Sequence, residues 1–255
     1  MGRKRVKPLV VRKNPIDVAN MVIDMASEQS KDCIVMMSLG KDSIVTLDLL
    51  YDKFERIVCV FMYLVKDLEH IQRWINWLKA RYPKIEFEQI PHWNTTYNLH
   101  YGVYCVPNPK VKVLNLSMVV KALKKRFGIE YVFFGMKKAD SMNRSLMLKS
   151  YEDENYIHGG NCYPLADFTQ KQILLQLDDF IHEMGLEWGM DKAKIYARGI
   201  QRMKDDSYIE ELFGKHLADI TSDIEKKYNL SPAEAMKRAY GEMKRYVGFK
   251  EKSNE

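Results

Sequence analysis

The sequence lacks several features that would assign it to a specialised class of protein. It has four cysteines in 255 residues, Cys33, Cys59, Cys105 and Cys162, and no two of them form a C-x-x-C pair. This wide spacing excludes a disulfide framework and predicts a protein of the reducing cytoplasm. No apolar run approaches the roughly 20 residues that a membrane-spanning helix needs, and the basic start is not followed by the apolar core of a signal peptide. We therefore expect no membrane partner.

The excess of positive charge lies at one end of the chain. The composition is otherwise ordinary for a globular protein, with 46% hydrophobic and 29% charged residues and a formal net charge of +6. Six cations precede the first acidic residue, Asp17: Arg3, Lys4, Arg5, Lys7, Arg12 and Lys13. The rest of the chain has equal numbers of acidic and basic residues. We predict that residues 1–13 form a basic arm. It is either a solvated terminus or a contact for nucleic-acid phosphates.

Helix caps and apolar runs alternate along the first two thirds of the sequence. Asn14-Pro15 predicts a helix start, Ser117 a second and Thr169 with Gln172 a third. We predict buried strands over 33–37, 57–63, 85–90 and 131–134, and helices over 15–30, 44–51, 67–81, 117–127, 169–184 and 231–247. The apolar residues over 91–113 follow neither a helical nor a strand periodicity, which predicts a long functional loop.

This order predicts an α/β fold, a parallel twisted sheet with helices on both faces, followed by helices alone. We divide the chain into the basic arm, an α/β domain over 14–184 and a helical extension over 185–255. The extension is a candidate surface for a second copy of the chain or for a partner protein. Ligands of parallel sheets lie at the carboxyl ends of the strands, so the loops after the four strands are expected to share one rim.

One loop on that rim has the composition of an anion site. Ser38-Leu39-Gly40-Lys41-Asp42-Ser43 joins the first strand to a helix. Such a turn exposes backbone N–H groups and the positive end of the helix dipole, Gly40 permits close approach, and Lys41 adds a cation. The spacing is not that of a Walker A loop. An ordinary capped helix with a serine-rich turn is the alternative interpretation of these six residues.

Three segments together resemble a known family. Residues 38–43 resemble the PP-loop, S-[GL]-G-K-D-S, of the adenine nucleotide α-hydrolase-like enzymes. Residues 135–144, GMKKADSMNR, resemble the G-x-R-x-x-[EQD]-S-x-x-R element of the phosphoadenosine phosphosulfate (PAPS) reductase branch, and residues 163–169, YPLADFT, resemble its P-L-x-[DN]-W-T segment. The three occur in the family's order over about residues 30–180, which makes the resemblance specific.

The resemblance implies roles for particular residues. Ser38, Leu39, Gly40, Lys41, Asp42, Ser43, Gly135 and Ser141 would bind an adenine nucleotide, ATP or PAPS. Asp42 would also be the candidate ligand of a Mg²⁺ ion. Lys41, Lys137 and Arg144 would be catalytic, because cations that face the phosphates neutralise a leaving pyrophosphate or sulfate. Lys137 stands where the family often has Arg, and Lys lacks the bidentate fork. The alternative to these functional roles is that Lys137 and Lys138 are solvated and that Arg144 only forms an ion pair with Asp140.

The chain departs from the family where its reductases carry their nucleophile. It lacks the C-terminal E-C-G-[IL]-H segment, so reductive chemistry through a thiolate is not expected. It also lacks the cysteine pairs of relatives that bind an iron–sulfur cluster, so no cluster is expected. We therefore predict an enzyme that cleaves ATP between the α- and β-phosphates and adenylates an unidentified acceptor. The alternatives are a PAPS- or APS-dependent sulfonyl transfer, and a nucleotide-binding subunit without catalysis.

Overall fold

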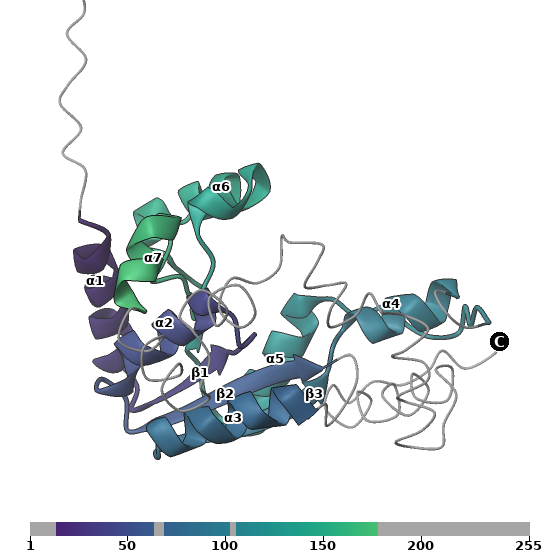
Figure 1. Ribbon diagram of the computed structural model, residues 1–255. Coiled ribbons are helices and arrows are strands. Elements are labelled where there is room, and N and C mark those ends of the chain that lie inside the picture. Colours follow the sequence, from purple (N-terminus) through teal and green to yellow (C-terminus); the bar gives the residue numbers. More distant parts are fainter. Residues whose placement is uncertain (1–13, 64–68, 103–105, 178–255) are drawn as a thin grey trace, which may run out of the picture.

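The described residues form a six-stranded sheet in the order β3-β2-β1-β4-β6-β5. Figure 1 shows the neighbouring strands β1, β2 and β3 of this sheet. The computed structural model describes residues 14–63, 69–102 and 106–177. Five strands run parallel, and only β5 runs antiparallel, to β6. The strands are β1 (Asp32–Met36), β2 (Arg56–Tyr63), β3 (Ile85–Pro91), β4 (Val132–Phe133), β5 (Ile157–His158) and β6 (Asn161–Cys162). The predicted α/β fold with a parallel sheet is confirmed.

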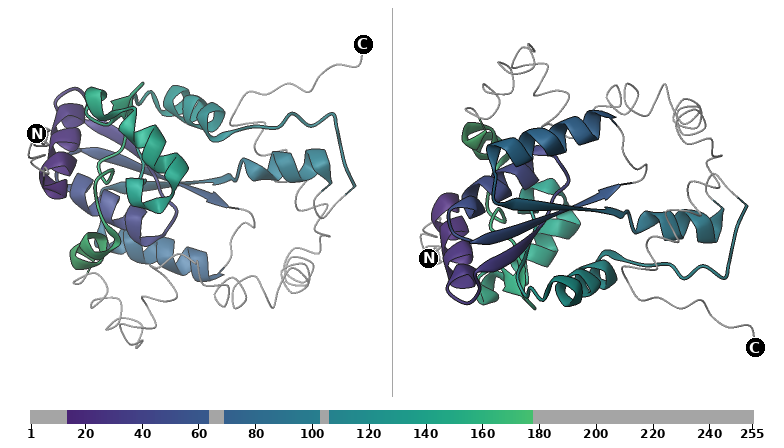
Figure 2. Two further views of the ribbon diagram at one scale, coloured as in Figure 1. Left: turned by 90° about the horizontal axis from the view of Figure 1, so that it is seen from above. Right: turned by 90° about the horizontal axis from the view of Figure 1, so that it is seen from below.

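Helices cover both faces of this sheet. In both views of Figure 2, α3 lies on one side of the strands and α5 on the other. The helices are α1 (Pro15–Ser27), α2 (Lys41–Tyr51), α3 (Glu69–Arg81), α4 (Asn94–Tyr101), α5 (Leu116–Phe127), α6 (Met142–Lys149) and α7 (Gln170–Gln176), with 3₁₀ turns η1 (Lys138–Asp140) and η2 (Glu152–Glu154). None of the helices in these described ranges is long and apolar enough to cross a membrane.

The helix caps follow the sequence closely. The Asn14 side chain accepts a hydrogen bond from the Ile16 amide at 3.3 Å, directly before Pro15 at the first helical position. Thr169 and Gln172 form the expected capping box of α7. Gly128, at φ 69°, ends α5 in the left-handed conformation that glycine adopts without a steric penalty. These local interactions fix where the elements begin and end.

Three expectations about local structure were wrong, and the short elements α6, β5 and β6 were not predicted. Asn115, not Ser117, caps α5, because its side chain accepts from the Met118 amide at 3.0 Å. The stretch 91–113 contains α4, β4 is only two residues long, and α6 and the β5–β6 hairpin follow it. These missed elements are all short, so they carry too few apolar repeats to show a period.

Several other expectations lie outside the described residues. They are the basic arm over 1–13, the end of the helix predicted to reach residue 184, the helix over 231–247, and the whole extension over 185–255. The division into a 14–184 domain and that extension therefore stays a prediction.

The core of the sheet lies where β1 is flanked by neighbours on both sides. Its central residues Cys33, Ile34 and Val35 are fully buried. Chain order places β2 on one side of β1 and β4 on the other, so the connections after the adjacent strands β1 and β4 start side by side and lead to opposite edges of the sheet. A reversal of this kind opens the crevice in which doubly wound sheets hold their ligands. The fold thus places residues 38–43 and 135–144 next to each other.

Gly135 makes this approach possible. A Cβ atom at Gly135 would lie 2.8 Å from the carbonyl carbon of Asp42 and 3.0 Å from the amide nitrogen of Ser43. Both are backbone atoms of the first turn of α2, so neither can move aside without displacing the helix. The absence of a side chain at Gly135 therefore sets the distance between the two loops.

We predict that Gly135→Ala destabilises the protein by about 1–3 kcal/mol, the usual cost of adding a methyl group to a closely packed contact. The measurement is chemical unfolding followed by circular dichroism. Unchanged stability would mean that the two loops do not approach each other as closely as described.

Candidate functional site

Two serine hydroxyl groups organise the loop between β1 and α2. The Ser43 hydroxyl accepts a hydrogen bond from the Ser38 amide at 3.2 Å and donates one to the Gly40 carbonyl at 2.9 Å. The Ser38 hydroxyl lies 3.2 Å from that of Ser43. Between them, Leu39 adopts a φ of 59°, a conformation that is uncommon for residues other than glycine. Non-glycine residues in this region cluster at functional sites, because the surrounding structure must hold them there.

The start of α2 is left without a side-chain cap. Gly40 is the N-cap residue and supplies no hydrogen-bonding side chain, so the amide groups of the first turn point out of the helix without a cap. The positive end of the helix dipole lies at the same place. Lys41 is the first helical residue, and only 8% of it is exposed. The geometry is that of an anion-binding helix N-terminus.

Two lysines, one at the start of α2 and one in the loop after β4, lie beside the carboxylate of Asp42. The Lys41 ammonium lies 2.8 Å from Asp42 Oδ2, and the Lys137 ammonium lies 2.6 Å from Asp42 Oδ1. Lys137 belongs to the loop after β4 and is only 1% exposed. Lys137 Nζ also lies 2.9 Å from Asp140 Oδ1, so the buried ammonium lies between two carboxylates.

Asp140 continues the chain of charges outward to Arg144. Its two carboxylate oxygens lie 2.9 Å from the Lys137 ammonium and 2.7 Å from the Arg144 guanidinium, and the second oxygen also accepts from the Lys137 amide. Burial alone would raise the pKa of the Asp140 carboxyl, but Lys137 and Arg144 hold this pKa below its ordinary value. Asp140 thus stays ionised, and it orients one cation on each side.

The structure brings most of the predicted site residues together. The PP-loop residues 38–43, Gly135 and Lys137 form one contiguous cluster. Arg144 does pair with Asp140, as the alternative interpretation had it, and through Asp140 it is linked to this cluster. Ser141 caps α6 by accepting from the Arg144 amide at 3.2 Å, so its observed contact is structural. Lys137 is buried rather than solvated.

Asp140 is the residue that the sequence prediction missed as part of the site. It appeared there only as a salt-bridge partner. The signal was its place three residues after Lys137 and four before Arg144, a spacing that lets one carboxylate reach both cations across a single turn.

The residues present do not form a Mg²⁺ site in their described arrangement. Both carboxylate oxygens of Asp42 contact lysine ammonium groups. Within the ranges that the structure covers, no three His, Cys, Asp or Glu side chains converge as a metal site would need. A cation at Asp42 would first have to displace two lysines, so we derive no step through a metal ion.

A second polar cluster surrounds Lys138. Because the backbone at Lys137 is extended, the next side chain points to the other side. The Lys138 ammonium lies 2.8 Å from both Asp167 and the Tyr156 hydroxyl, and it also contacts Glu152. These partners raise its pKa, although burial opposes the shift. Lys138 is therefore paired, not solvated.

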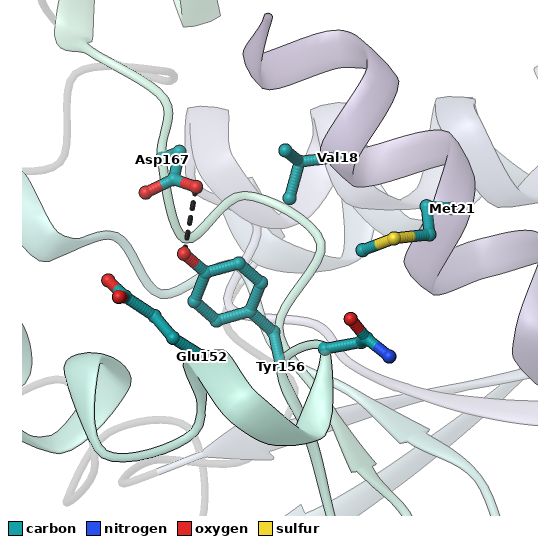
Figure 3. A pocket seen from close by; sticks show the side chains of 6 residues that line it. Val18, Met21, Glu152, Tyr156 and Asp167 are labelled. Atoms are coloured by element: carbon teal, nitrogen blue, oxygen red, sulfur yellow. Dashed lines mark hydrogen bonds between the residues drawn. The ribbon is translucent and has the colours of Figure 1, made fainter. Parts of the chain in front are cut away.

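The Lys138 cluster borders a small pocket beside α1 (Figure 3). The pocket has a volume of about 150 Å³ and is lined by Val18, Met21, Glu152, Asn155, Tyr156 and Asp167. The Tyr156 hydroxyl donates to Asp167 at 2.8 Å. Burial raises the pKa of Tyr156 to about 12; Lys138 opposes this shift and Asp167 adds to it. These bonds tie the Asp167 segment to Lys138 of η1 and to Tyr156, so we interpret the cluster as a structural one.

The described cysteines are not nucleophiles. Cys33, Cys59 and Cys162 are buried in strands and carry free thiols. Burial raises the pKa of all three, that of Cys162 to about 12. Their thiolate fraction at neutral pH is therefore negligible. Cys105 lies outside the described residues.

We predict that Asp140→Asn lowers the free energy of unfolding by about 1–2 kcal/mol at pH 7, since it removes a charged hydrogen-bond acceptor from two cations. The pKa of Asp140 is lowered in the folded state, so its contribution is present above the ordinary pKa and is lost as the pH falls below about 4. Urea unfolding at pH 7 and pH 3 measures this. The exposed Asp153→Asn is the control, and a difference between Asp140→Asn and wild type that does not shrink at pH 3 would contradict the assignment.

Comparison with known proteins agrees with the resemblance in sequence. The sequence profile described as phosphoadenosine phosphosulfate reductase domain matches residues 32–187, more than half of the chain. No curated protein matches. Among solved structures, the NH3-dependent NAD synthetase from Campylobacter jejuni in complex with the nitrate ion is similar with a TM-score of 0.43 and 15% identity, over 95% of this chain and 100% of that one.

The NMN synthetase from Francisella tularensis is similar with a TM-score of 0.42 and 13% identity, over 96% of this chain and 100% of that one. Likeness at this level says nothing about the chemistry of this chain. The profile match begins at the first residue of β1 and continues through the loop of residues 38–43, the 135–144 element and α7. The chain therefore belongs to the phosphoadenosine phosphosulfate reductase family of PP-loop proteins.

Proposed function

We propose that the protein binds the phosphates of an adenine nucleotide between the PP-loop and Lys137. The observation that carries this proposal is the convergence of Lys41 and Lys137, both nearly buried, at the uncapped start of α2. Buried cations are costly unless they are paired. Here Asp42 contacts both lysines, and Asp140 is a further partner of Lys137. A phosphate chain would supply oxygens to the two ammonium groups and to the free amides of the helix.

The reaction that suits this arrangement is cleavage of ATP between its α- and β-phosphates. An acceptor oxygen or nitrogen would attack the α-phosphorus, the bond from that phosphorus to the bridging oxygen would break, and pyrophosphate would leave with the electron pair. Fixed cations stabilise the charge that develops on the leaving group. Lys41 and Lys137 would hold the phosphates, and Arg144 would contact the departing group from the rim. The product would be an adenylated acceptor.

The family's name supports a second candidate ligand, PAPS. A sulfonyl transfer from PAPS or APS would use the same cations for a different anion. The missing C-terminal cysteine segment argues against reduction by this chain, and the described thiols are protonated. A subunit that binds nucleotide without turnover is the third outcome.

Titration calorimetry with ATP and with PAPS on the full chain, followed by assays for pyrophosphate and sulfite, separates these candidates. Pyrophosphate release from ATP supports adenylation. Tight PAPS binding without turnover supports the non-catalytic subunit. Binding of neither ligand would contradict the proposal.

We predict that Lys41→Met weakens ATP binding about 10- to 100-fold, the range for losing a hydrogen bond to a charged group. The matched control is Lys53→Met, just beyond the other end of α2, where the lysine pairs with Asp24 on the surface. Calorimetry on both variants, with thermal melting to verify folding, gives the comparison. Equal affinities for the two variants would exclude the PP-loop as the phosphate site.

We predict that Arg144→Ala lowers the rate of turnover more than the affinity for nucleotide. Its side chain is 47% exposed and approaches the cluster only through Asp140, so it contributes little to the resting site. An interaction that strengthens in the transition state appears as a loss in kcat at a similar Kd. Lys149→Ala, at the other end of α6, is the control, and equal losses of kcat and affinity would assign Arg144 to binding alone.

A further inference from the structure

A protruding element follows β3 at the rim of the sheet that carries the PP-loop. We define the α4 arm as residues 91–102 and 106–115. In Figures 1 and 2 it extends away from the sheet beyond the end of β3. The helix and the returning chain are joined by hydrogen bonds: the Asn108 amide donates to Leu99 at 2.8 Å, and the Leu114 amide donates to the Thr96 hydroxyl at 2.9 Å. The α4 arm is thus a built element.

The α4 arm also has a small core of its own. Leu99, Val111 and Leu114 are buried, and the His100 ring contacts the Val111 carbonyl at 2.6 Å. Thr96 is fully buried, and its hydroxyl donates to the Trp93 carbonyl at 2.7 Å. These contacts hold the remaining side chains of the helix in fixed positions on the outside.

Two tyrosines occupy that outer surface. Tyr97 is 47% exposed and Tyr101 is 58% exposed. They are one helical turn apart, and their ring centroids lie 4.5 Å from each other. His100 adds a third ring 4.6 Å from Tyr101. Large aromatic side chains are normally buried, so a cluster of exposed rings on a rigid element is a candidate binding platform.

The charged residues in the sequence around these rings have one sign. Residues 89–129 contain no Asp or Glu, although the chain has 34 of them. The returning part of the α4 arm carries Lys110 and Lys112, both exposed. A protein partner with an ordinary mixed surface would not require this absence of acids, whereas a polyanion would. Lysines beside exposed aromatic rings are the combination that binds the phosphates and bases of single-stranded nucleic acid.

We propose that the α4 arm binds single-stranded nucleic acid, with bases stacked on Tyr97 and Tyr101 and phosphates held near Lys110 and Lys112. The proposal goes beyond the nucleotide site and does not depend on it, because the binding needs no ATP. Stacking on tyrosine tolerates any base, so the binding is expected to be weakly sequence-specific. The lysine contacts are expected to make it strongly dependent on salt.

The test is fluorescence anisotropy with the full chain in the absence of ATP. The labelled probes are 20-nucleotide single strands of dT and of U, and a duplex of the same length. Tyr97→Ala/Tyr101→Ala should weaken binding of a single strand at least about tenfold, as expected for loss of stacking. Tyr97→Phe/Tyr101→Phe keeps the rings and should bind like wild type. Comparison of dT with U shows which nucleic acid is preferred.

A separate control tests the contribution of net charge, because the basic residues 1–13 could also attract nucleic acid. Lys110→Glu should weaken binding more than Lys31→Glu, which makes the same charge change just before β1, at the amino end of the strands and thus away from the α4 arm. Equal effects of the two variants would mean that only net charge matters and would overturn the proposal. It would also be overturned by unaltered binding in the tyrosine double alanine variant with an intact melting transition, or by tighter binding of the duplex.

Discussion

The site depends on one carboxylate held between two ammonium groups. Asp42 lies in the first turn of α2, Lys41 approaches one of its oxygens and Lys137 approaches the other. The contact joins the loop after β1 to the loop after β4, whose backbones touch at Gly135. In a nearly buried setting each of these charges would be costly alone, and together they are tolerated. The same contact stores two cations at the start of a helix, where an anion is favoured.

The family match and the local geometry both support the proposed nucleotide site, whereas the sequence lacks the cysteine segment expected for the family's reductive chemistry. The profile match covers both loops of the site. The reductases of the family, however, act through a C-terminal cysteine segment that this sequence lacks, and the described thiols lie deep in the sheet. The described residues of the proposed site are cations and backbone amides, the groups that the proposed phosphoryl transfer would use.

Much of the fold was predictable because its long elements carry strong local signals. Asn14-Pro15 and the Thr169–Gln172 box predicted two helix starts correctly, and the apolar runs of β1 and β2 predicted their burial. The short elements α4, α6, β5 and β6 were missed, since a few residues cannot display a period. The role of Asp140 was missed for another reason. Its importance depends on Lys137 being buried, which is a property of the tertiary structure and not of the local sequence.

The alternation of charge from Lys41 to Arg144 has a consequence for selectivity. Three cations and two anions leave this cluster with little net charge, so its long-range attraction for passing anions is weak. An incoming molecule must compete with Asp42 at close range, and it succeeds only if several of its oxygens engage at once. In the proposed function, inorganic phosphate would offer too few of these contacts, whereas a chain of phosphates would replace the carboxylate. The resident acid would thus favour extended anions over small ones.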